Sequence, residues 1–445
     1  MEDMASDRRD QAVRAAVAQG LLSAAEPVVA LLDTAGIRAS AAALTAAFAA
    51  VTDTRVLHAF AVKAAPLVPV LRLLDACGLG AEVASPGELA LARAAGVPPD
   101  RTVLDSPAKT HEELRRALAL GIAVNADNLQ ELARIDALVA GAPTASPLGL
   151  RVNPQLGAGA IGALSTATGT SKFGVALRDP GAREAVVRLF LDRPWLRRLH
   201  THSGSQGVPP TLMAEGVKAA YVLAEEIDTK AGRRQIDTID IGGGLPVNFA
   251  SDEETPTYAA YAELLASTVP GLFDGRYALV TEFGRSLLAK HGTILTRVEY
   301  TKTSGSRPIA VTHAGVQVAT RTVYAPESWP LRVLAYDAGG RPSTGEETVQ
   351  DVAGPACFAG DLLVTARTLP LLRPGDVVAV PDTGAYYFAH HYAYNSLPRP
   401  SVHGFTVTGE GTAGAEVVFT TVRPAQTLDE IVAESGGGWP DALLT

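Results

Sequence analysis

Beyond residue 50, short apolar runs alternate with longer stretches of helical periodicity. Eight of these runs are expected to be strands, over residues 56–64, 80–85, 102–105, 122–126, 148–153, 196–203, 236–242 and 277–283. Alternation of this kind predicts βα units and a parallel sheet. Eight such units close a (β/α)8 barrel of the TIM type, which usually takes ~250 residues. We therefore expect an α/β protein with a barrel over residues 51–295.

Helix start and stop signals between the runs support this reading. The segment 85–88 (Ser-Pro-Gly-Glu) is typical of a capped helix start, and Gly96 of the end of that helix. Thr110 and Asp127, each followed three residues later by Glu or Gln, indicate two more helix starts. The positions of these signals agree with helices between the predicted strands.

From about residue 295 the pattern changes, because helical periodicity fades and short β-branched runs take its place. Such runs cover residues 294–301, 307–313, 376–382 and 416–422, with Gly, Pro and Thr turns between them. We expect a C-terminal all-β domain over residues 296–445. Residues 1–50 are expected to form N-terminal helices and a strand at 27–33 that joins the β domain.

Composition narrows the function classes. The chain has 445 residues, 47% of them hydrophobic and 19% charged, and a net charge of −9. This acidic balance without a basic cluster argues against a nucleic-acid or anionic-membrane partner. Cys77 and Cys357 form no disulfide framework or zinc motif. With neither a secretory signal nor an apolar run of roughly 20 residues, we expect a cytoplasmic protein.

Polar residues and glycines follow several predicted strands, at the rim where barrel enzymes place their active sites. A lysine after an apolar strand is partly desolvated, and its free amine then suits Schiff-base chemistry. A glycine loop lets backbone N–H groups approach a phosphate. Each alone also fits a structural role, as a snorkelling lysine or a tight turn. These rim residues are Lys63, Ser85, His202, Ser205, Gly242, Gly243, Gly244, Glu282, Gly284 and Arg285.

A series of short motifs runs in order between residues 60 and 400. They are FAVKA (60–64), EVASPGEL (82–89), SPAKT (106–110), NADNLQEL (125–132), LRVNP (150–154), SKFG (171–174), HTHSGSQ (200–206), DIGGGL (240–245), TEFGR (281–285), GPACFAGD (354–361), DTGAY (382–386) and YNSLPRP (394–400). Together they resemble the fold-type III pyridoxal-phosphate decarboxylases, the group of diaminopimelate and ornithine decarboxylases, with the diaminopimelate pattern nearest. The resemblance implies an alanine-racemase-like barrel, a C-terminal β domain and pyridoxal 5′-phosphate as cofactor.

The resemblance also assigns residues to the cofactor. It implies that Lys63 carries the cofactor covalently, that Glu282 faces the pyridine nitrogen and keeps it protonated, and that His202 stacks on the ring. The residues it implies for the phosphate group are Ser205, Gly242, Gly243, Gly244, Gly284, Arg285 and Tyr386.

On the substrate side, Arg321 stands where the diaminopimelate enzymes place an arginine for a substrate carboxylate, a bidentate task. Cys357 matches a cysteine that reaches across a homodimer interface and protonates the carbanion carbon after CO2 leaves. We therefore expect a homodimeric lyase that decarboxylates an amino acid and releases an amine or an L-amino acid. Its catalytic residues would be Lys63, His202 and Cys357.

The sequence departs from this family directly after the cysteine. Most relatives have Glu or Asp there, which pairs with the distal ammonium of the substrate, whereas this chain has Phe358. An aromatic side chain cannot form the ion pair, and a buried unpaired ammonium is costly. We hypothesise that the preferred substrate lacks a free distal ammonium, or that Asp361 replaces the contact.

Three alternative functions remain at this point. His200 and His202 resemble the HxH pair of metal-dependent hydrolases, but such a site requires further ligands at other strand ends, and we expect no metal. An amino-acid racemase or epimerase shares the fold and the lysine, but uses a tyrosine as its second base. A regulatory homologue would have lost the lysine or the acid, whereas Lys63 and Cys357 are both present.

Overall fold

The chain folds into two compact units, which we call the barrel unit and the β unit. A computed structural model describes residues 2–141, 144–162, 165–409 and 415–444. The barrel unit comprises residues 38–247 and 254–287, and the β unit comprises residues up to 37, the segment 248–253, and residues from 288 onward. The barrel unit thus begins at residue 38 and ends at residue 287, whereas the sequence predicted that it begins at 51 and ends at 295.

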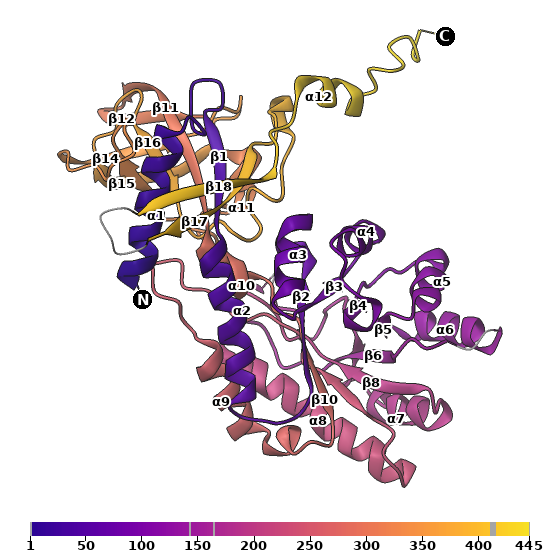
Figure 1. Ribbon diagram of the computed structural model, residues 1–445. Helices are drawn as coiled ribbons and strands as arrows, with labels where there is room; N and C mark the ends of the chain where they lie inside the picture. The colour runs from indigo at the N-terminus through magenta and orange to yellow at the C-terminus, as the bar shows by residue number, and fades with distance from the viewer. Residues whose placement is uncertain (1, 142–143, 163–164, 410–414, 445) are drawn as a thin grey trace. The chain divides into compact units, whose positions relative to one another are not determined.

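The barrel unit is a closed ring of parallel strands (Figure 1). The ring closes because β10 pairs with β2 and β5 pairs with β6. The short strand β7 (Val175–Ala176) adds to the side of β6. Every strand expected from the sequence is present, most of them one to three residues shorter. The ring strands are β2 (Val56–Ala61), β3 (Gly80–Val83), β4 (Thr102–Leu104), β5 (Ala123–Ala126), β6 (Leu148–Asn153), β8 (Leu196–His200), β9 (Thr238–Asp240) and β10 (Ala278–Thr281).

Helices follow the barrel strands in alternation, as a parallel ring requires. Their apolar faces are buried; in α8 these include Met213, Val217 and Leu223. No helix in the described ranges is long and apolar enough to cross a membrane. The helices are α2 (Thr34–Ala49), α3 (Val68–Ala76), α4 (Pro86–Ala94), α5 (His111–Leu120), α6 (Leu129–Gly141), α7 (Ala182–Asp192), α8 (Pro210–Ala231), α9 (Tyr258–Thr268) and α10 (Arg285–Leu288).

Two of the predicted helix starts are confirmed and one is wrong. The Ser85 and Thr110 side chains cap α4 and α5. Asp127 does not cap α6, because its carboxylate accepts a hydrogen bond from Gly174 N at 3.2 Å. Asn128 caps the helix instead, accepting from Glu131 N at 2.9 Å. A local pattern of cap residues does not reveal that a more distant partner takes the aspartate.

The β unit is built around one large mixed sheet with the order β15-β14-β12-β11-β1-β17-β18, and β16 pairs with β11 and β13. The early strand β1 lies between β11 and β17, as expected of the strand at 27–33. The strands are β1 (Val28–Asp33), β11 (Gly292–Ser304), β12 (Arg307–Thr312), β13 (Leu334–Tyr336), β14 (Glu347–Ala353), β15 (Leu362–Pro370), β16 (Val377–Val380), β17 (Ser401–Thr408) and β18 (Glu416–Arg423).

The expected C-terminal β domain is confirmed, and helices accompany its sheet in the described residues. Helix α1 (Glu2–Ala18) lies in the N-terminal segment where helices were expected, whereas α11 (Val316–Tyr324) and α12 (Leu428–Glu434) were not expected from the sequence. Helix α1 packs Val13 against the core side of the sheet, where Val29 and Leu295 are buried. Helix α11 begins where the Asp361 carboxylate accepts a hydrogen bond from Val316 N at 2.6 Å. Because the capping residue lies 45 residues away in the sequence, the local periodicity did not predict this helix.

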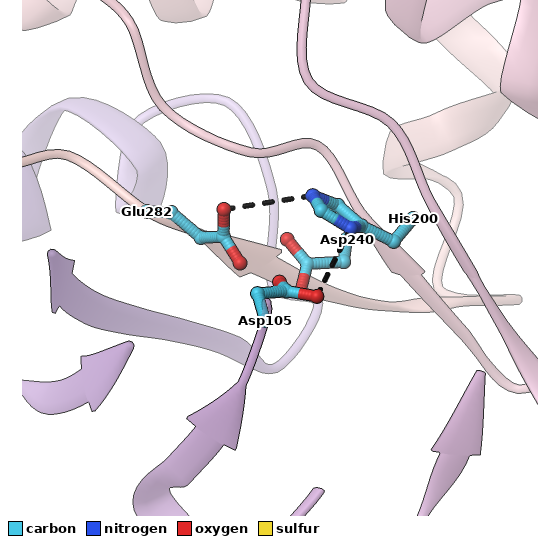
Figure 2. A group of neighbouring side chains, drawn as sticks. All are labelled: Asp105, His200, Asp240 and Glu282. Carbon is cyan, nitrogen blue, oxygen red and sulfur yellow. Dashed lines mark ion pairs between the residues drawn. The ribbon is translucent and has the colours of Figure 1, made fainter. Parts of the chain in front are cut away.

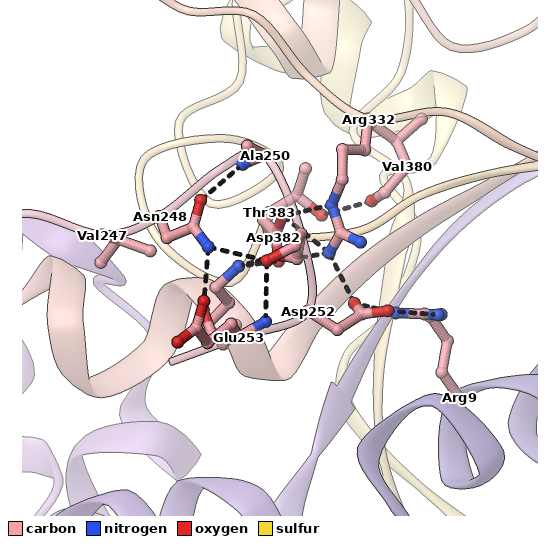
Figure 3. Close-up of polar contacts among 12 residues, drawn as sticks. Arg9, Val247, Asn248, Ala250, Asp252, Glu253, Arg332, Val380, Asp382 and Thr383 are labelled. Carbon is pink, nitrogen blue, oxygen red and sulfur yellow. Dashed lines mark hydrogen bonds and ion pairs between the residues drawn. The ribbon is translucent and has the colours of Figure 1, made fainter. Parts of the chain in front are cut away.

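Ion pairs fasten the segment 248–253 to the rest of the β unit (Figure 3). The Asp252 carboxylate accepts hydrogen bonds from Arg9 at 2.7 Å and Arg332 at 2.6 Å. Arg332 also bonds to Asp382, at 2.9 Å. Burial opposes the charged form of Asp252, but the bonds from Arg9 and Arg332 hold the pKa of its carboxyl below the ordinary value. The network therefore stays charged near neutral pH.

Candidate active site

The candidate site of the barrel unit lies at the C-terminal ends of its strands. Lys63 follows β2, His202 follows β8, the glycines 242–244 follow β9, and Glu282 follows β10. Parallel strands place these ends on one rim, so residues far apart in sequence meet there. The rim positions predicted from the sequence therefore gather on a single face of the barrel.

Lys63 sits in a single 3-10 turn, Val62–Ala64, rather than at the end of a longer strand. Its side chain is 43% exposed and forms an ion pair with Glu82, which is only 1% exposed. Strand β2 ends two residues before Lys63, and the side chain is partly covered, so the expectation of a partly desolvated amine stays a prediction. Burial raises the pKa of Glu82, and the Lys63 charge opposes that rise.

His202 is held in one orientation by the glycine loop. Its Nδ1 accepts a hydrogen bond from Gly243 N at 3.0 Å, so a neutral ring carries its proton on Nε2. Burial lowers the pKa of His202 well below its ordinary value, and the charges of Arg151 and Lys63 act in the same direction. A neutral, flat ring with a fixed tilt is suited to stacking on a planar ligand.

The loop after β9 requires glycine at each of its three positions. Gly242 and Gly244 have φ of +68° and +101°, in the left-handed region that side chains avoid. A Cβ on Gly243 would collide with the Glu282 carbonyl, and one on Gly244 with the Gly204 carbonyl. Backbone is thus packed closely around the loop. Gly242 N donates to Asp240 Oδ1 at 3.1 Å and Gly243 N to His202 Nδ1 at 3.0 Å. Gly244 N is the loop amide with no hydrogen bond among the described residues that a phosphate would displace.

Glu282 lies in a buried cluster with three residues that the sequence did not single out as a group (Figure 2). His200 Nε2 is 3.5 Å from Glu282 Oε2, and His200 Nδ1 is 3.3 Å from Asp105 Oδ1. Asp240 completes the cluster, whose four side chains offer atoms within 4.8 Å of one another. The only sequence signal was that all four stand at strand ends, which becomes informative once the ring is closed.

The argument that His200 lacks further possible metal ligands at other strand ends was wrong. The sequence appeared to offer too few ligands near the HxH pair, yet the fold brings Asp105, Asp240 and Glu282 around His200. Protein donors already serve the two aspartates, however. Asn125 Nδ2 donates to both aspartates at 3.2 Å, and Arg198 Nη2 is 3.5 Å from Asp240. His202 is not part of the cluster, so the HxH pair does not act as one metal-binding unit.

In the β unit, two residues predicted from the sequence are in contact with each other. The Arg321 guanidinium lies over the Tyr386 ring at 4.5 Å and over the Trp329 ring at 5.0 Å. Tyr386 in turn stacks on His390, with ring centroids 5.7 Å apart. Arg321 Nη1 is buried without a hydrogen-bond partner among the described residues. An arginine held this way keeps donors free for an acidic ligand.

Cys357 is exposed and stands next to an aromatic group that we call the aromatic cluster: Tyr324, Phe358, Tyr392 and Tyr394. Phe358 stacks on Tyr324 at 5.4 Å, and Tyr392 stacks on Tyr394 at 5.9 Å. The loop around Cys357 is fixed by its backbone, since Cys357 N donates to Asn395 Oδ1 at 2.8 Å. The sequence predicted Phe358 but not its three tyrosine neighbours.

Asp361 has a different environment from the one that substrate binding would require. Its carboxylate is 3% exposed and accepts hydrogen bonds from Val316 N at 2.6 Å and Ala356 N at 2.8 Å. Burial raises its pKa, while these bonds oppose the rise. Both oxygens already hold backbone amides, which makes Asp361 the anchor of the Cys357 loop. A contact from Asp361 to a substrate ammonium stays a prediction. It would have to compete with the two backbone amides that already occupy the carboxylate oxygens.

The family model for pyridoxal-dependent decarboxylases, described as the pyridoxal binding domain, matches residues 35–289. The chain belongs to the pyridoxal-dependent decarboxylases. This membership agrees with the sequence prediction of a pyridoxal phosphate-dependent carboxy-lyase that acts on an amino acid. It does not favour the racemase or the metal-dependent hydrolase.

Relatives of this decarboxylase cover most of the chain. It is 30% identical to a diaminopimelate decarboxylase of Zymomonas mobilis, over 85% of each chain. It is 33% identical to one from Pseudomonas aeruginosa, over 84% of this chain and 85% of that one. A solved diaminopimelate decarboxylase from Helicobacter pylori, complexed with L-lysine, has a TM-score of 0.80 at 24% identity and covers 94% of this chain and 99% of that chain, which shows the shared fold.

The residues of this decarboxylase fit pyridoxal phosphate. Glu282 Oε1 is buried and has no hydrogen-bond partner among the residues described, as expected of a group that awaits a ring nitrogen. The glycine loop after β9 tolerates no Cβ. Lys63 reaches the same rim with an amine that solvent can contact. A carboxylate, a backbone phosphate cradle and a primary amine are the donor set that this cofactor requires.

Proposed function

We propose that this decarboxylase acts on an amino acid whose distal end carries no free ammonium group. The observation that carries the proposal is the aromatic cluster around Phe358, at the position directly after Cys357. The proposal rests on the sequence resemblance for the role of this position and on the present structure for its surroundings.

The aromatic cluster disfavours a distal ammonium for a physical reason. The ring centroids of Phe358 and Tyr394 lie 6.4 Å apart, and those of Tyr324 and Tyr392 lie 6.1 Å apart. Phe358 is therefore surrounded by aromatic side chains. A primary ammonium keeps its hydration unless a carboxylate replaces it, and a cation–π contact returns only about 0.5–2 kcal/mol. The acid nearest in sequence, Asp361, is engaged with backbone amides. Apolar, aromatic or acylated distal groups suit this surface better.

The barrel residues provide the cofactor-binding part of the proposal. Lys63 binds the cofactor covalently, Glu282 holds a proton at the ring nitrogen, and His202 stacks on the ring face. When bound, pyridoxal phosphate supplies an electron sink for the charge that remains at the α-carbon as CO2 departs. The barrel residues proposed to hold the phosphate are Ser205, Gly242, Gly243, Gly244, Gly284 and Arg285, and Tyr386 of the β unit is proposed to hold it with them.

The β unit provides the substrate-binding part. Arg321, clamped between two aromatic rings, binds a carboxylate of the substrate. Cys357 donates its proton to the α-carbon after CO2 has left, which requires an exposed thiol on a fixed loop. We propose a cytoplasmic homodimer in which Cys357 serves the site of the partner subunit.

The test is CO2 release from purified, pyridoxal-loaded protein with meso-diaminopimelate and with a panel of D- and L-amino acids. We expect turnover of a substrate without a distal ammonium and little turnover of diaminopimelate. Rapid decarboxylation of diaminopimelate by the wild type would refute the proposed specificity. The Phe358→Glu variant should raise kcat/KM for diaminopimelate on the order of 10- to 100-fold.

A control separates this effect from a general effect of added charge. Tyr300 is an aromatic residue of the same unit that is 66% exposed, and Tyr300→Glu should leave the substrate preference unchanged. Two further variants test the assigned chemistry. Lys63→Ala should abolish the visible absorbance of the bound cofactor together with activity. Cys357→Ala should retain that absorbance while turnover falls, and unchanged turnover would refute its role as an acid.

A further inference from the structure

The buried cluster around His200 connects Glu282 to Asp105, a residue to which the sequence resemblance assigns no role. Asp105 follows β4, and it is joined to Glu282 through the His200 ring (Figure 2). Asp105, His200 and Glu282 are 7%, 1% and 5% exposed. Solvent therefore neither screens these charges nor supplies hydrogen-bond partners, and their balance is set within the cluster.

The cluster has an excess of negative groups. Asp240 is compensated by Arg198, 3.5 Å away, and by the Asn125 amide. Asp105 accepts a hydrogen bond from the same Asn125 amide and forms an ion pair with Nδ1 of His200. Glu282 has the other nitrogen of that imidazole and a hydrogen bond shared with the Asp105 carboxyl. An oxygen of Asp105 lies 3.3 Å from one ring nitrogen and an oxygen of Glu282 lies 3.5 Å from the other, which fits a proton on both nitrogens and hence an imidazolium at His200.

The pKa shifts of the three groups agree with an imidazolium at His200. Burial by itself lowers the pKa of His200, but the surrounding carboxylates, Asp105 first among them, raise it to about 10. Burial also opposes the charged form of Asp105, yet His200 holds the pKa of that carboxyl well below its ordinary value. Burial and the charge of Asp240 raise the pKa of Glu282 well above its ordinary value. This direction favours a proton on Glu282 in the cofactor-free pocket.

We propose that Asp105 and His200 are positioning residues that turn Glu282 toward the ring nitrogen of the cofactor and drive the proton shared between them onto that nitrogen. This inference rests on the proposed binding of pyridoxal phosphate at Glu282. Glu282 would supply the proton that the ring nitrogen takes, and its carboxylate would then be balanced by the His200 imidazolium 3.5 Å away. No proton from solvent is required.

The role of Asp105 follows from the same balance. Asp105 is the first of the three carboxylates that raise the pKa of His200, so its loss weakens the hold of His200 on its second proton. The Asp105 charge also raises the pKa of Glu282 directly. We expect the weakened imidazolium to outweigh this lost repulsion, because the His200 ring lies 3.5 Å from the Glu282 carboxyl. The shared proton would then stay on Glu282, and the ring nitrogen would be neutral.

The test is the ring-nitrogen chemical shift of 15N-labelled pyridoxal phosphate bound to the wild type and to Asp105→Asn. We expect the shift of a protonated ring in the wild type and the shift of a neutral ring in the variant. The dissociation constant of the cofactor, from fluorescence titration of the apo protein, should rise on the order of tenfold. A merely structural role for Asp105 would not change the protonation of a ring that still binds.

Asp136→Asn is the matched control, because it removes the same charge from an ion pair with Arg193 elsewhere in the barrel unit. It should change neither readout. If Asp105→Asn does not fold, His200→Gln removes the imidazolium and should give the same neutral ring. A ring that stays protonated in either folded variant would overturn the proposal.

Two other outcomes would also overturn the proposal. One is a stoichiometric divalent metal in the wild type that is lost in Asp105→Asn, which would make the cluster a metal site. The other is a wild type that binds no pyridoxal phosphate, which would refute the proposed cofactor site as well. Failure of the proposed substrate specificity is distinguishable, because neither the chemical shift nor the cofactor titration involves a substrate.

Discussion

Gly243 N lies 3.0 Å from His202 Nδ1 and donates a hydrogen bond to it. The bond defines the tautomer of the ring and its tilt, and it ties the stacking residue to the glycine loop. A single backbone amide thus couples two parts of the cofactor site that stand 41 residues apart in the chain.

We expect His202 to remain neutral, with its proton on Nε2, through the range of about pH 5 to 8 where histidine usually titrates. Burial and the Arg151 charge keep its pKa well below the ordinary value. Two-dimensional 1H–15N NMR of the ring nitrogens measures the tautomer and the titration together. A titration midpoint close to 6.5 would contradict this prediction.

His58 makes the stability of the protein depend on pH. Burial lowers the pKa of His58 from 6.5 to about 4. The folded pKa is below the unfolded one, so this contribution is fully present above pH 6.5 and is lost as the pH falls toward 4. The loss in free energy of unfolding should be about 3 kcal/mol over that interval.

Urea unfolding of wild type and His58→Asn at several pH values checks this. Asparagine can still accept the hydrogen bond from Thr281, whose Oγ1 lies 2.8 Å from His58 Nδ1. The difference between the two proteins should therefore vary with pH in the predicted direction. Parallel curves for the two proteins would show that His58 does not contribute.

Asp361→Ala should destabilise the β unit by about 3 kcal/mol, because it leaves two buried backbone amides without an acceptor. Thermal unfolding measures the loss. Asp337→Ala is the control, since Asp337 also accepts from two backbone amides, at 2.9 Å each, in an exposed turn where water can replace it. A variant of Asp361 with unchanged stability and altered substrate preference would favour a substrate contact instead.

Gly244→Ala should destabilise the barrel unit by about 2–4 kcal/mol and weaken cofactor binding. Its φ of +101° strains any side chain, and the Cβ would meet the Gly204 carbonyl, which belongs to the backbone and cannot turn aside. Gly87→Ala lies in helix α4, where the nearest atom to an added Cβ is Ser85 Oγ at 3.7 Å. That variant should be neutral or slightly stabilising. Equal effects of both variants, measured by thermal unfolding and cofactor titration, would contradict this account.

The amino-acid sequence by itself determined the barrel, most of the β unit and the residue types at the strand ends. Alternation of apolar strands and amphipathic helices is local, so it appears in a single sequence. Lys63, Glu282 and the glycine loop were singled out for the same reason, because each stands or begins within two residues of the end of a strand. The order of short motifs also predicted the decarboxylase family that the family model then matched.

Only the tertiary structure decided which of these residues act together. Asp105 and His200 belong to strands that are not neighbours in the ring, and nothing in their sequence spacing indicates that the ring brings them within 3.3 Å. The cap of α6 at Asn128 and the anchoring of the Cys357 loop by Asp361 depend likewise on partners distant in sequence. Hydrogen bonds and buried charges select their partners by position in space, and that position exists only after the ring and the sheet have closed.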